Sequence, residues 1–251
     1  MFKIIDNQKF IEFEFNGIKI IQANNPTIII KNFFDDNINI EINGLKISKD
    51  NIVHFNEITK FNEIIRLSKN SNVFKAIFNE MEEFPIINYE NINRITEKIN
   101  NEHFELLENS DGDLSKLILS FFQLLDLGYL DKEKFIFLIE NFFNDKKYTF
   151  ILENISWLNS NDLLEYINNH NFIILTNDFR NYINNITDLE LLYISDDNLN
   201  GIDIIEKDSL INYLEKELNI ILDNSLFNKF LNNKEDLEME KIFFKIKTIK
   251  V

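Results

Sequence analysis

Four carboxylates within a short segment of the chain, ELLENSDGD, could bind a hard cation. They are Glu105, Glu108, Asp111 and Asp113, and no lysine or arginine stands among them. Calcium takes roughly six to eight oxygen ligands in flexible geometry, and an acidic turn supplies several from side chains and backbone carbonyls. The segment is not an EF-hand loop, because no glutamate follows at the position that ends such a loop. The alternative is a solvated acidic turn in which Asp111 or Asp113 caps the next helix.

A second segment, residues 45–75, has an excess of positive charge and could bind phosphates. Its carboxylates are Asp50, Glu57 and Glu63. Its cations are Lys46, Lys49, Lys60, Arg66, Lys69 and Lys75. Phosphates of the DNA backbone bind lysine and arginine but carry no base information, so such a contact would be independent of DNA sequence. The alternative is an ordinary solvated surface.

A third candidate is Glu153, which follows the apolar run Tyr148–Leu152. A nucleotide hydrolase carries at this place the acidic residue that helps hold Mg²⁺. A second apolar run, Phe172–Leu175, follows one helix later, and two strands joined in this way pair in parallel. No glycine of the chain stands in the phosphate-binding pattern G-x-x-x-x-G-K-[ST]. We therefore expect an ATPase-like sheet without ATPase chemistry, the alternative being that Glu153 simply ends a strand.

The histidines do not suggest a metal centre. His54, His103 and His170 lie far apart and have no metal-ligand spacing. His54 stands in an alternating strand pattern and His103 on an apolar helix stripe, so we expect structural roles for them.

The first 60 residues alternate between apolar and polar types, which predicts short strands. The strands are expected at 10–15, 18–21, 27–30, 38–42 and 52–55. Gly17 and Gly44 are expected at hairpin turns. From about Glu57 the spacing changes to that of helices, which are expected over 74–81, 92–107, 114–125 and 135–143. Asp131 is a plausible cap for the last of them.

The α/β pattern resumes at Tyr148, with a helix over 160–170 that Asn159 or Ser160 can cap and a strand over 189–194. The tail has helices near 210–221 and 227–231, and its terminal run IFFKIKTIKV is predicted to form a basic edge strand. The sequence thus predicts an α/β fold of three parts. They are an ATPase-like head domain without a phosphate-binding loop (residues 1–61 and 146–201), an inserted α-helical leg domain (62–145) and a C-terminal extension (202–251).

The composition fits a cytoplasmic protein with its own core. The chain has 251 residues, of which 45% are hydrophobic, and no cysteine. It opens without a secretory signal and has no apolar run near the roughly 20 residues that span a bilayer, so no membrane role is expected. The formal charge of -16 argues against coating nucleic acid through bulk basicity. DNA binding would need a local basic surface or a bound cation.

Four segments, in this order along the chain, resemble the Csn-two family of type II-A CRISPR adaptation proteins. They are INGLKISKDNIVHF (42–55), NSNVFKAIFNEMEEFP (70–85), FELLENSDGDLSKLILSF (104–121) and the unit from Tyr148 through Ile194. The resemblance implies an α/β head with a helical leg, a homotetrameric ring and no catalysis. It implies DNA held in the central hole by lysines, and calcium ions that stiffen the legs. The chain departs from the family in two places. The segment between Phe34 and Ile38 is too short for the helix that usually follows the family's early strand, and the tail beyond about residue 200 is an extension.

Three functions follow as hypotheses. The first is a non-catalytic protein that binds double-stranded DNA ends during spacer acquisition in antiviral defence, beside the CRISPR integrase proteins and the RNA-guided effector nuclease, with structural Ca²⁺. The second is a degenerate ATPase or metal-dependent nuclease in which Glu153 would activate water. The third is a protein-interaction module without nucleic-acid binding, which the acidic charge and the helical stripes would suit.

Overall fold

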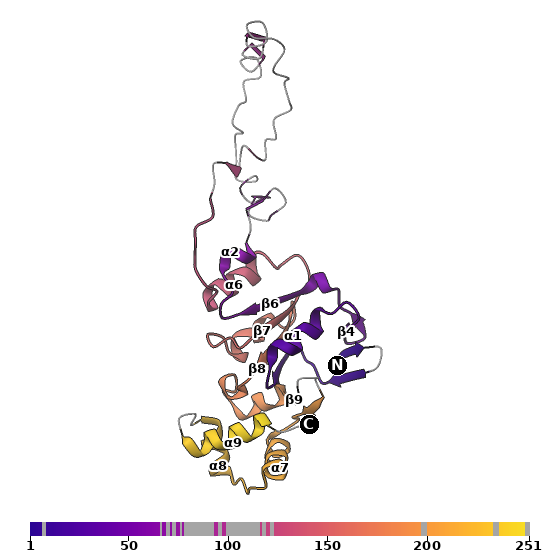
Figure 1. Ribbon diagram of the computed structural model, residues 1–251, viewed down its shortest axis with the longest axis vertical. Helices are drawn as coiled ribbons and strands as arrows, with labels where there is room; N and C mark the ends of the chain where they lie inside the picture. The colour runs from indigo at the N-terminus through magenta and orange to yellow at the C-terminus, as the bar shows by residue number, and fades with distance from the viewer. Residues whose placement is uncertain are drawn as a thin grey trace. The chain divides into compact units, whose positions relative to one another are not determined.

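A computed structural model gives the fold of the chain (Figure 1). It describes residues 1–6, 9–65, 123–196, 200–232 and 236–248, and positions 67, 68, 71, 74, 75, 77, 93, 94, 97, 98, 116, 119 and 120. The chain divides into two compact units, one formed by residues 1–59 with 130–251 and the other by residues 60–129. No helix in the described ranges is long and apolar enough to cross a membrane.

The larger unit contains a six-stranded sheet of order β10-β9-β3-β8-β7-β6. Its strands are β3 (Ile18–Gln22), β6 (Ile52–Asn56), β7 (Thr149–Glu153), β8 (Asn171–Thr176), β9 (Leu192–Ser195) and β10 (Gly201–Asp203). All neighbours pair in parallel except β9 and β10. Every residue of β3, β7, β8 and β9 is buried, as in a parallel sheet covered on both faces. The α/β class and the parallel pairing of the two apolar runs are confirmed.

A second, four-stranded antiparallel sheet belongs to the same unit, with the order β2-β1-β4-β5. Its strands are β1 (Phe2–Asp6), β2 (Lys9–Phe13), β4 (Asn39–Ile42) and β5 (Leu45–Lys46). The predicted hairpin turn at Gly44 is confirmed: Asn43 and Gly44 both have positive φ, as a tight turn between β4 and β5 requires.

The predicted hairpin turn at Gly17 is wrong, because β2 and β3 belong to different sheets. Gly17, at φ +93°, instead lies where the chain passes between them. A Cβ atom there would stand 2.8 Å from Cβ of Ile167, so a side chain would clash.

Helix α1 (Pro26–Phe34) replaces the strand expected over 27–30. Pro26 occupies the first turn, where its fixed φ favours a helix, and the helix buries Ile29, Ile30 and Phe33 on one side. These side chains join a core cluster that also contains Phe2 of β1 and Ile151 of β7. The sequence placed an early strand over residues 27–30 and found no room for a helix after it, whereas in the structure α1 itself follows the early strand β3.

The other face of the parallel sheet is covered by α6 (Lys132–Asn141). Asp131 caps this helix as predicted, accepting a hydrogen bond from the backbone N–H of Lys134. Phe135 of α6 packs edge-on against Phe55 and Phe150, at centroid distances of 5.7 and 5.8 Å. An aromatic core thus joins α6 to β6 and β7.

Short 3-10 segments connect the strands, namely η1 (Lys49–Asn51), η2 (Ser160–Tyr166), η3 (Phe179–Asn181) and η4 (Ile186–Leu191). The expected helix over 160–170 is the shorter η2, capped by Asn159 as predicted. The strand expected over 189–194 begins only at Leu192, because η4 occupies the preceding residues.

Three helices follow the last strand: α7 (Lys207–Leu218), α8 (Asn224–Asn232) and α9 (Leu237–Thr248). The basic edge strand predicted for IFFKIKTIKV is wrong, because the run continues α9 up to Thr248. Met239 and Phe243, four residues apart, are both buried and lie on one helical face. Alternation of lysine and isoleucine fitted a strand, but this spacing favours a helix.

In the smaller unit, α2 (Phe61–Ile64) begins after Lys60, which forms an isolated antiparallel bridge with Tyr129. The helices expected over 74–81, 92–107 and 114–125 fall largely outside the described residues.

Candidate functional site

The carboxyl ends of the parallel strands are the first place to look for a site, because ligands of open α/β sheets bind in the crevice outside these ends. In this chain the strand order places β3 between β8 and β9, two strands that come much later in the sequence. Only three residues, Ala23 to Asn25, connect β3 to α1. None of them is a glycine.

Glu153, the predicted acidic residue, ends β7 and is buried, with 9% of its surface exposed. The hydroxyl of Thr27 donates to its Oε1 atom at 2.6 Å. Its Oε2 atom lies 3.0 Å from Nε2 of His54 on the neighbouring strand β6. Both carboxylate oxygens therefore contact side chains of the protein itself.

The ends of β3 and β8 are also joined by protein groups. The buried side chain of Gln22 donates to the carbonyl of Asn177 at 3.0 Å and accepts from the backbone N–H of Phe179 at 2.9 Å. The N–H of Ala23 donates to the carbonyl of Thr176 at 2.9 Å. Asn154, with φ +47°, accepts the N–H of Asn177 on its side chain. These bonds occupy backbone groups at the carboxyl ends of β3 and β8.

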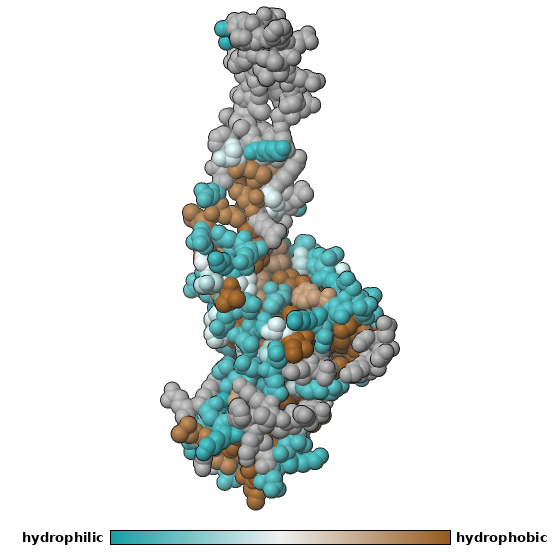
Figure 2. Space-filling model, in the orientation of Figure 1, coloured by the Kyte–Doolittle hydropathy of each residue, from teal (hydrophilic) through white to brown (hydrophobic). Residues whose placement is uncertain are grey.

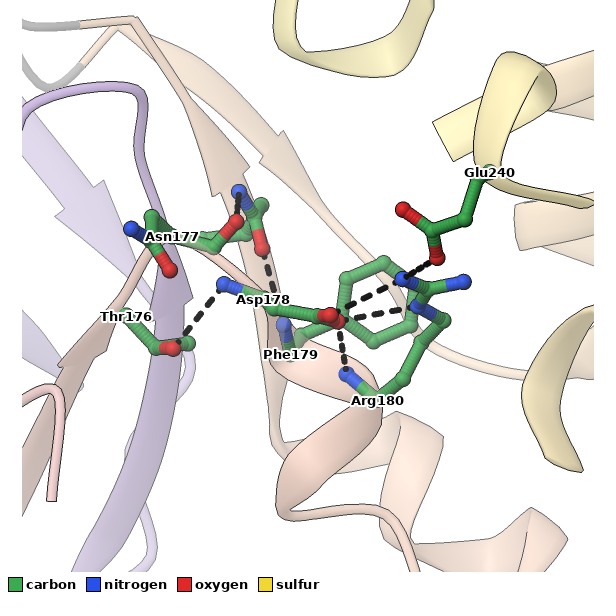
Figure 3. A network of polar contacts seen from close by, with 7 residues as sticks. Thr176, Asn177, Asp178, Phe179, Arg180 and Glu240 are labelled. Carbon is green, nitrogen blue, oxygen red and sulfur yellow. Dashed lines mark hydrogen bonds and ion pairs between the residues drawn. The ribbon is translucent and has the colours of Figure 1, made fainter. Parts of the chain in front are cut away.

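Just beyond β8, the buried Arg180 forms the centre of a charged cluster (Figure 3). Its guanidinium donates to both carboxylate oxygens of Asp178, at 2.9 and 2.8 Å, and to Glu240 of α9 at 2.7 Å. It also lies over the rings of Phe243 and Phe230, at 3.9 and 5.5 Å from their centroids. Burial alone would lower the pKa of Arg180, but the two carboxylates outweigh it and the pKa is raised.

The sequence reasoning missed this cluster. Arg180 is one of three arginines in a lysine-rich chain and directly follows Asp178-Phe179, which was the only local signal. Its partner Glu240 is far away in sequence, where periodicity cannot reveal a contact.

The structure gives the two lysines of the 42–55 segment different surroundings. Lys46 is exposed on β5, opposite Glu41 of β4. The amine of Lys49 donates to the carbonyls of Phe33 and Asp35 at the carboxyl end of α1, the latter at 3.0 Å. Burial lowers the pKa of Lys49, although nearby aspartates act in the opposite direction.

On the face shown in Figure 2, hydrophilic residues cover most of the described surface around scattered hydrophobic ones.

The remaining predicted site residues are placed only in part. Lys60 and Lys75 are exposed residues of the smaller unit. Arg66, Lys69, His103 and the four carboxylates Glu105, Glu108, Asp111 and Asp113 lie outside the described residues. Among the residues that the structure does describe, no group of three histidines or acidic residues is arranged to hold a metal ion.

Comparison with known proteins relates the chain to solved structures by fold. No protein-family model and no curated protein matches the sequence. The fold is similar to that in the crystal structure of Stu0660 of Streptococcus thermophilus, with a TM-score of 0.52 and 14% sequence identity. The match covers 98% of this chain and 92% of that chain, so it extends over both units. The comparison is consistent with a Csn-two-like fold for this protein.

Proposed function

We propose that this protein is a non-catalytic, sequence-independent binder of double-stranded DNA ends that acts in the cytoplasm during CRISPR spacer acquisition. The observation that carries the proposal is the fold match over 98% of the chain. It agrees with the Csn-two resemblance of four sequence segments that are spread from residue 42 to residue 194. The integrase proteins and the RNA-guided effector nuclease are the partners that this role implies.

The surroundings of Glu153 support a non-catalytic role. A carboxylate that helps hold Mg²⁺ needs an oxygen free for the ion or its water shell. Thr27 and His54 contact the two oxygens of Glu153, and Gln22 joins the strand ends beside it. The short connection after β3 also lacks the glycines that let a backbone wrap around phosphates.

The proposal includes a homotetrameric ring with DNA in its central hole. Lys46, Lys49, Lys60, Arg66, Lys69 and Lys75 are the proposed DNA-contacting residues. Four copies of a modest local excess of cations would together bind the phosphates of one duplex, despite the charge of -16 per chain. Of these residues Lys46 is the best placed, because its side chain is exposed, whereas the amine of Lys49 contacts the end of α1.

Calcium is proposed as a structural ion, held by Glu105, Glu108, Asp111 and Asp113. A set of carboxylate and carbonyl oxygen ligands suits calcium better than a transition metal. Bound calcium would offset part of the negative charge and so favour both assembly and DNA binding.

A mobility-shift experiment tests the proposal. The purified protein is mixed with a linear duplex or with the same DNA as a closed circle, in calcium or in EGTA, and its mass is measured in parallel. A calcium-stabilised tetramer that binds only linear DNA would support the ring, because a closed circle offers no end to thread. Equal binding to both DNAs would overturn end binding, and no binding in any condition would favour the protein-interaction hypothesis.

A further inference from the structure

A pocket of about 460 Å³ opens at the amino ends of β7 and β8, the sheet edge opposite to Glu153. It is lined by the end of α6, by residues 144–147 before β7 and by residues 166–170 before β8. Its volume falls in the range of small-molecule sites, roughly 300–1,000 Å³. Of the proposed DNA-contacting residues, the four that the structure describes (Lys46, Lys49, Lys60 and Lys75) do not line it.

His170 forms a fixed hydrogen-bond donor in this pocket. The residue is buried, with 3% of its surface exposed, and its ring packs edge-on against Phe150 at a centroid distance of 5.3 Å. Its Nδ1 atom accepts the backbone N–H of Tyr148 at 3.4 Å. The neutral ring must then carry its proton on Nε2. No described residue accepts a hydrogen bond from Nε2, which leaves this N–H for a ligand.

Two lysines add positive charge beside this imidazole. The amine of Lys147 contacts the carbonyls of Asn168 and Ile167 at 3.3 and 3.5 Å, which are long for hydrogen bonds of a charged group. Burial and, to a lesser degree, the charge of Lys147 lower the pKa of His170. The amine of Lys146 lies 5.0 Å from the centroid of the Tyr148 ring.

Two carboxylates also line the pocket, and each accepts a hydrogen bond from a tyrosine hydroxyl. The hydroxyl of Tyr166 donates to Glu140 and that of Tyr148 donates to Asp145, each at 2.9 Å. Burial and the bond to Asp145 raise the pKa of Tyr148 to about 12, so this phenol keeps its proton at neutral pH. Each carboxylate therefore has a tyrosine hydroxyl as a partner, and Lys146 and Lys147 are the cations of the lining.

We propose that this pocket binds a phosphate group, with Nε2–H of His170 and the amine of Lys147 donating to its oxygens. Charge-assisted hydrogen bonds of this kind are the strong contacts of phosphate sites. Lys146 supplies a second positive charge, and the volume leaves room for a sugar attached to the phosphate. The ligand is either free phosphate or the terminal phosphate of a DNA strand.

NMR of the imidazole signals tests the site on the intact protein. The chain has only three histidines, so loss of one set of signals in His170→Gln assigns His170. Inorganic phosphate, added at constant ionic strength with chloride as reference, should shift the His170 signals saturably and raise the pKa of the ring, because an anion favours its charged form. Lys147→Gln should weaken the affinity about tenfold.

Two further variants keep this test decisive. Lys147→Arg should retain binding, and Lys31→Gln, which changes an exposed lysine on α1 outside the pocket, should not alter it. His170 signals that do not respond to phosphate, or equal effects of Lys147→Gln and Lys31→Gln, would overturn the site.

The source of the phosphate is distinguished with a short duplex carrying or lacking 5′-phosphates. A His170 response that needs the 5′-phosphate supports a DNA end as ligand. A response to inorganic phosphate but to neither duplex supports a free phosphate. No response to any of these probes overturns the proposal, and it does so even if the protein binds DNA through the 45–75 lysines.

Discussion

Nη2 of Arg180 lies 2.7 Å from Oε1 of Glu240, and this ion pair joins the carboxyl edge of the parallel sheet to the last helix of the chain (Figure 3). Arg180 is 3% exposed, so its charge depends on Glu240 and on Asp178 for compensation. Buried ion pairs contribute little net stability, yet removing one partner is costly because the other charge stays buried. The C-terminal helices are therefore expected to unfold together with the α/β unit rather than separately.

Loss of this pair should destabilise the whole α/β unit. Glu240→Gln is expected to lower the free energy of unfolding by about 1 kcal/mol, since Arg180 keeps Asp178 and Glu240 is partly exposed. Arg180→Met should cost about 3 kcal/mol, because it leaves Asp178 without its partner. Urea unfolding can be followed by the fluorescence of Trp157, the only tryptophan, which packs against Phe135 of α6.

Glu217→Gln on the exposed side of α7 is the matched control and should leave the urea midpoint unchanged. If Glu240→Gln behaves like this control, the ion pair does not hold α9 to the sheet.

Glu153→Gln separates a structural from a catalytic role of the buried glutamate. An amide cannot accept hydrogen bonds on both of its polar atoms, so either Thr27 or His54 loses its acceptor. We expect a loss of about 1–2 kcal/mol in the free energy of unfolding. DNA binding should be unchanged at temperatures where the variant is folded. Release of phosphate from ATP by the wild type above the level of this variant would contradict the non-catalytic role.

The parts of the fold that the sequence predicted well are those specified by neighbouring residues. The apolar runs of β7 and β8 and the crossover between them dictated parallel pairing. The caps at Asp131 and Asn159 have short polar side chains directly before a helical segment. In each case the physical cause lies within a few residues of its effect.

The errors arose where local preference opposes the tertiary structure. Three consecutive isoleucines, Ile28 to Ile30, favour a strand, but burial of Ile29 and Phe33 on one face stabilises α1. At Glu153 the sequence indicated an acidic strand end without its partners Thr27 and His54, which come from other elements. Lys49 belonged to a basic segment in sequence, whereas in the structure its amine contacts the carbonyl of Phe33 on α1, 16 residues earlier in the chain.

Lys46 and Lys49 should respond differently to loss of charge. Lys46→Gln is expected to leave stability unchanged and to weaken DNA binding, reducing the salt slope by about 1 for each Lys46 that contacts a phosphate. Lys49→Gln should lower the free energy of unfolding by about 1 kcal/mol, because the carbonyls at the end of α1 lose their donor. Binding measured across a salt series, with urea unfolding of the same samples, separates the two effects.

Lys216→Gln, an exposed lysine on α7, is the control for both measurements. A salt slope that falls equally in Lys46→Gln and Lys216→Gln would remove Lys46 from the proposed DNA-contacting residues.

His170 should make the protein less stable in mild acid. Burial among Tyr148, Phe150 and Phe172, and the charge of Lys147, lower its pKa below the ordinary value of 6.5. Between the folded pKa and about 6.5 the unfolded chain binds a proton that the folded protein does not, so stability falls as the pH falls through this window. Above about pH 6.5 the ring is unprotonated in both states and this loss of stability is absent. The slope of stability against pH that one such group contributes is at most about 1.4 kcal/mol per pH unit.

In His170→Gln this part of the slope should disappear, as measured by urea unfolding from pH 7.5 to 5.5 in phosphate-free buffer. An unchanged slope would mean that His170 does not titrate differently in the folded and unfolded states.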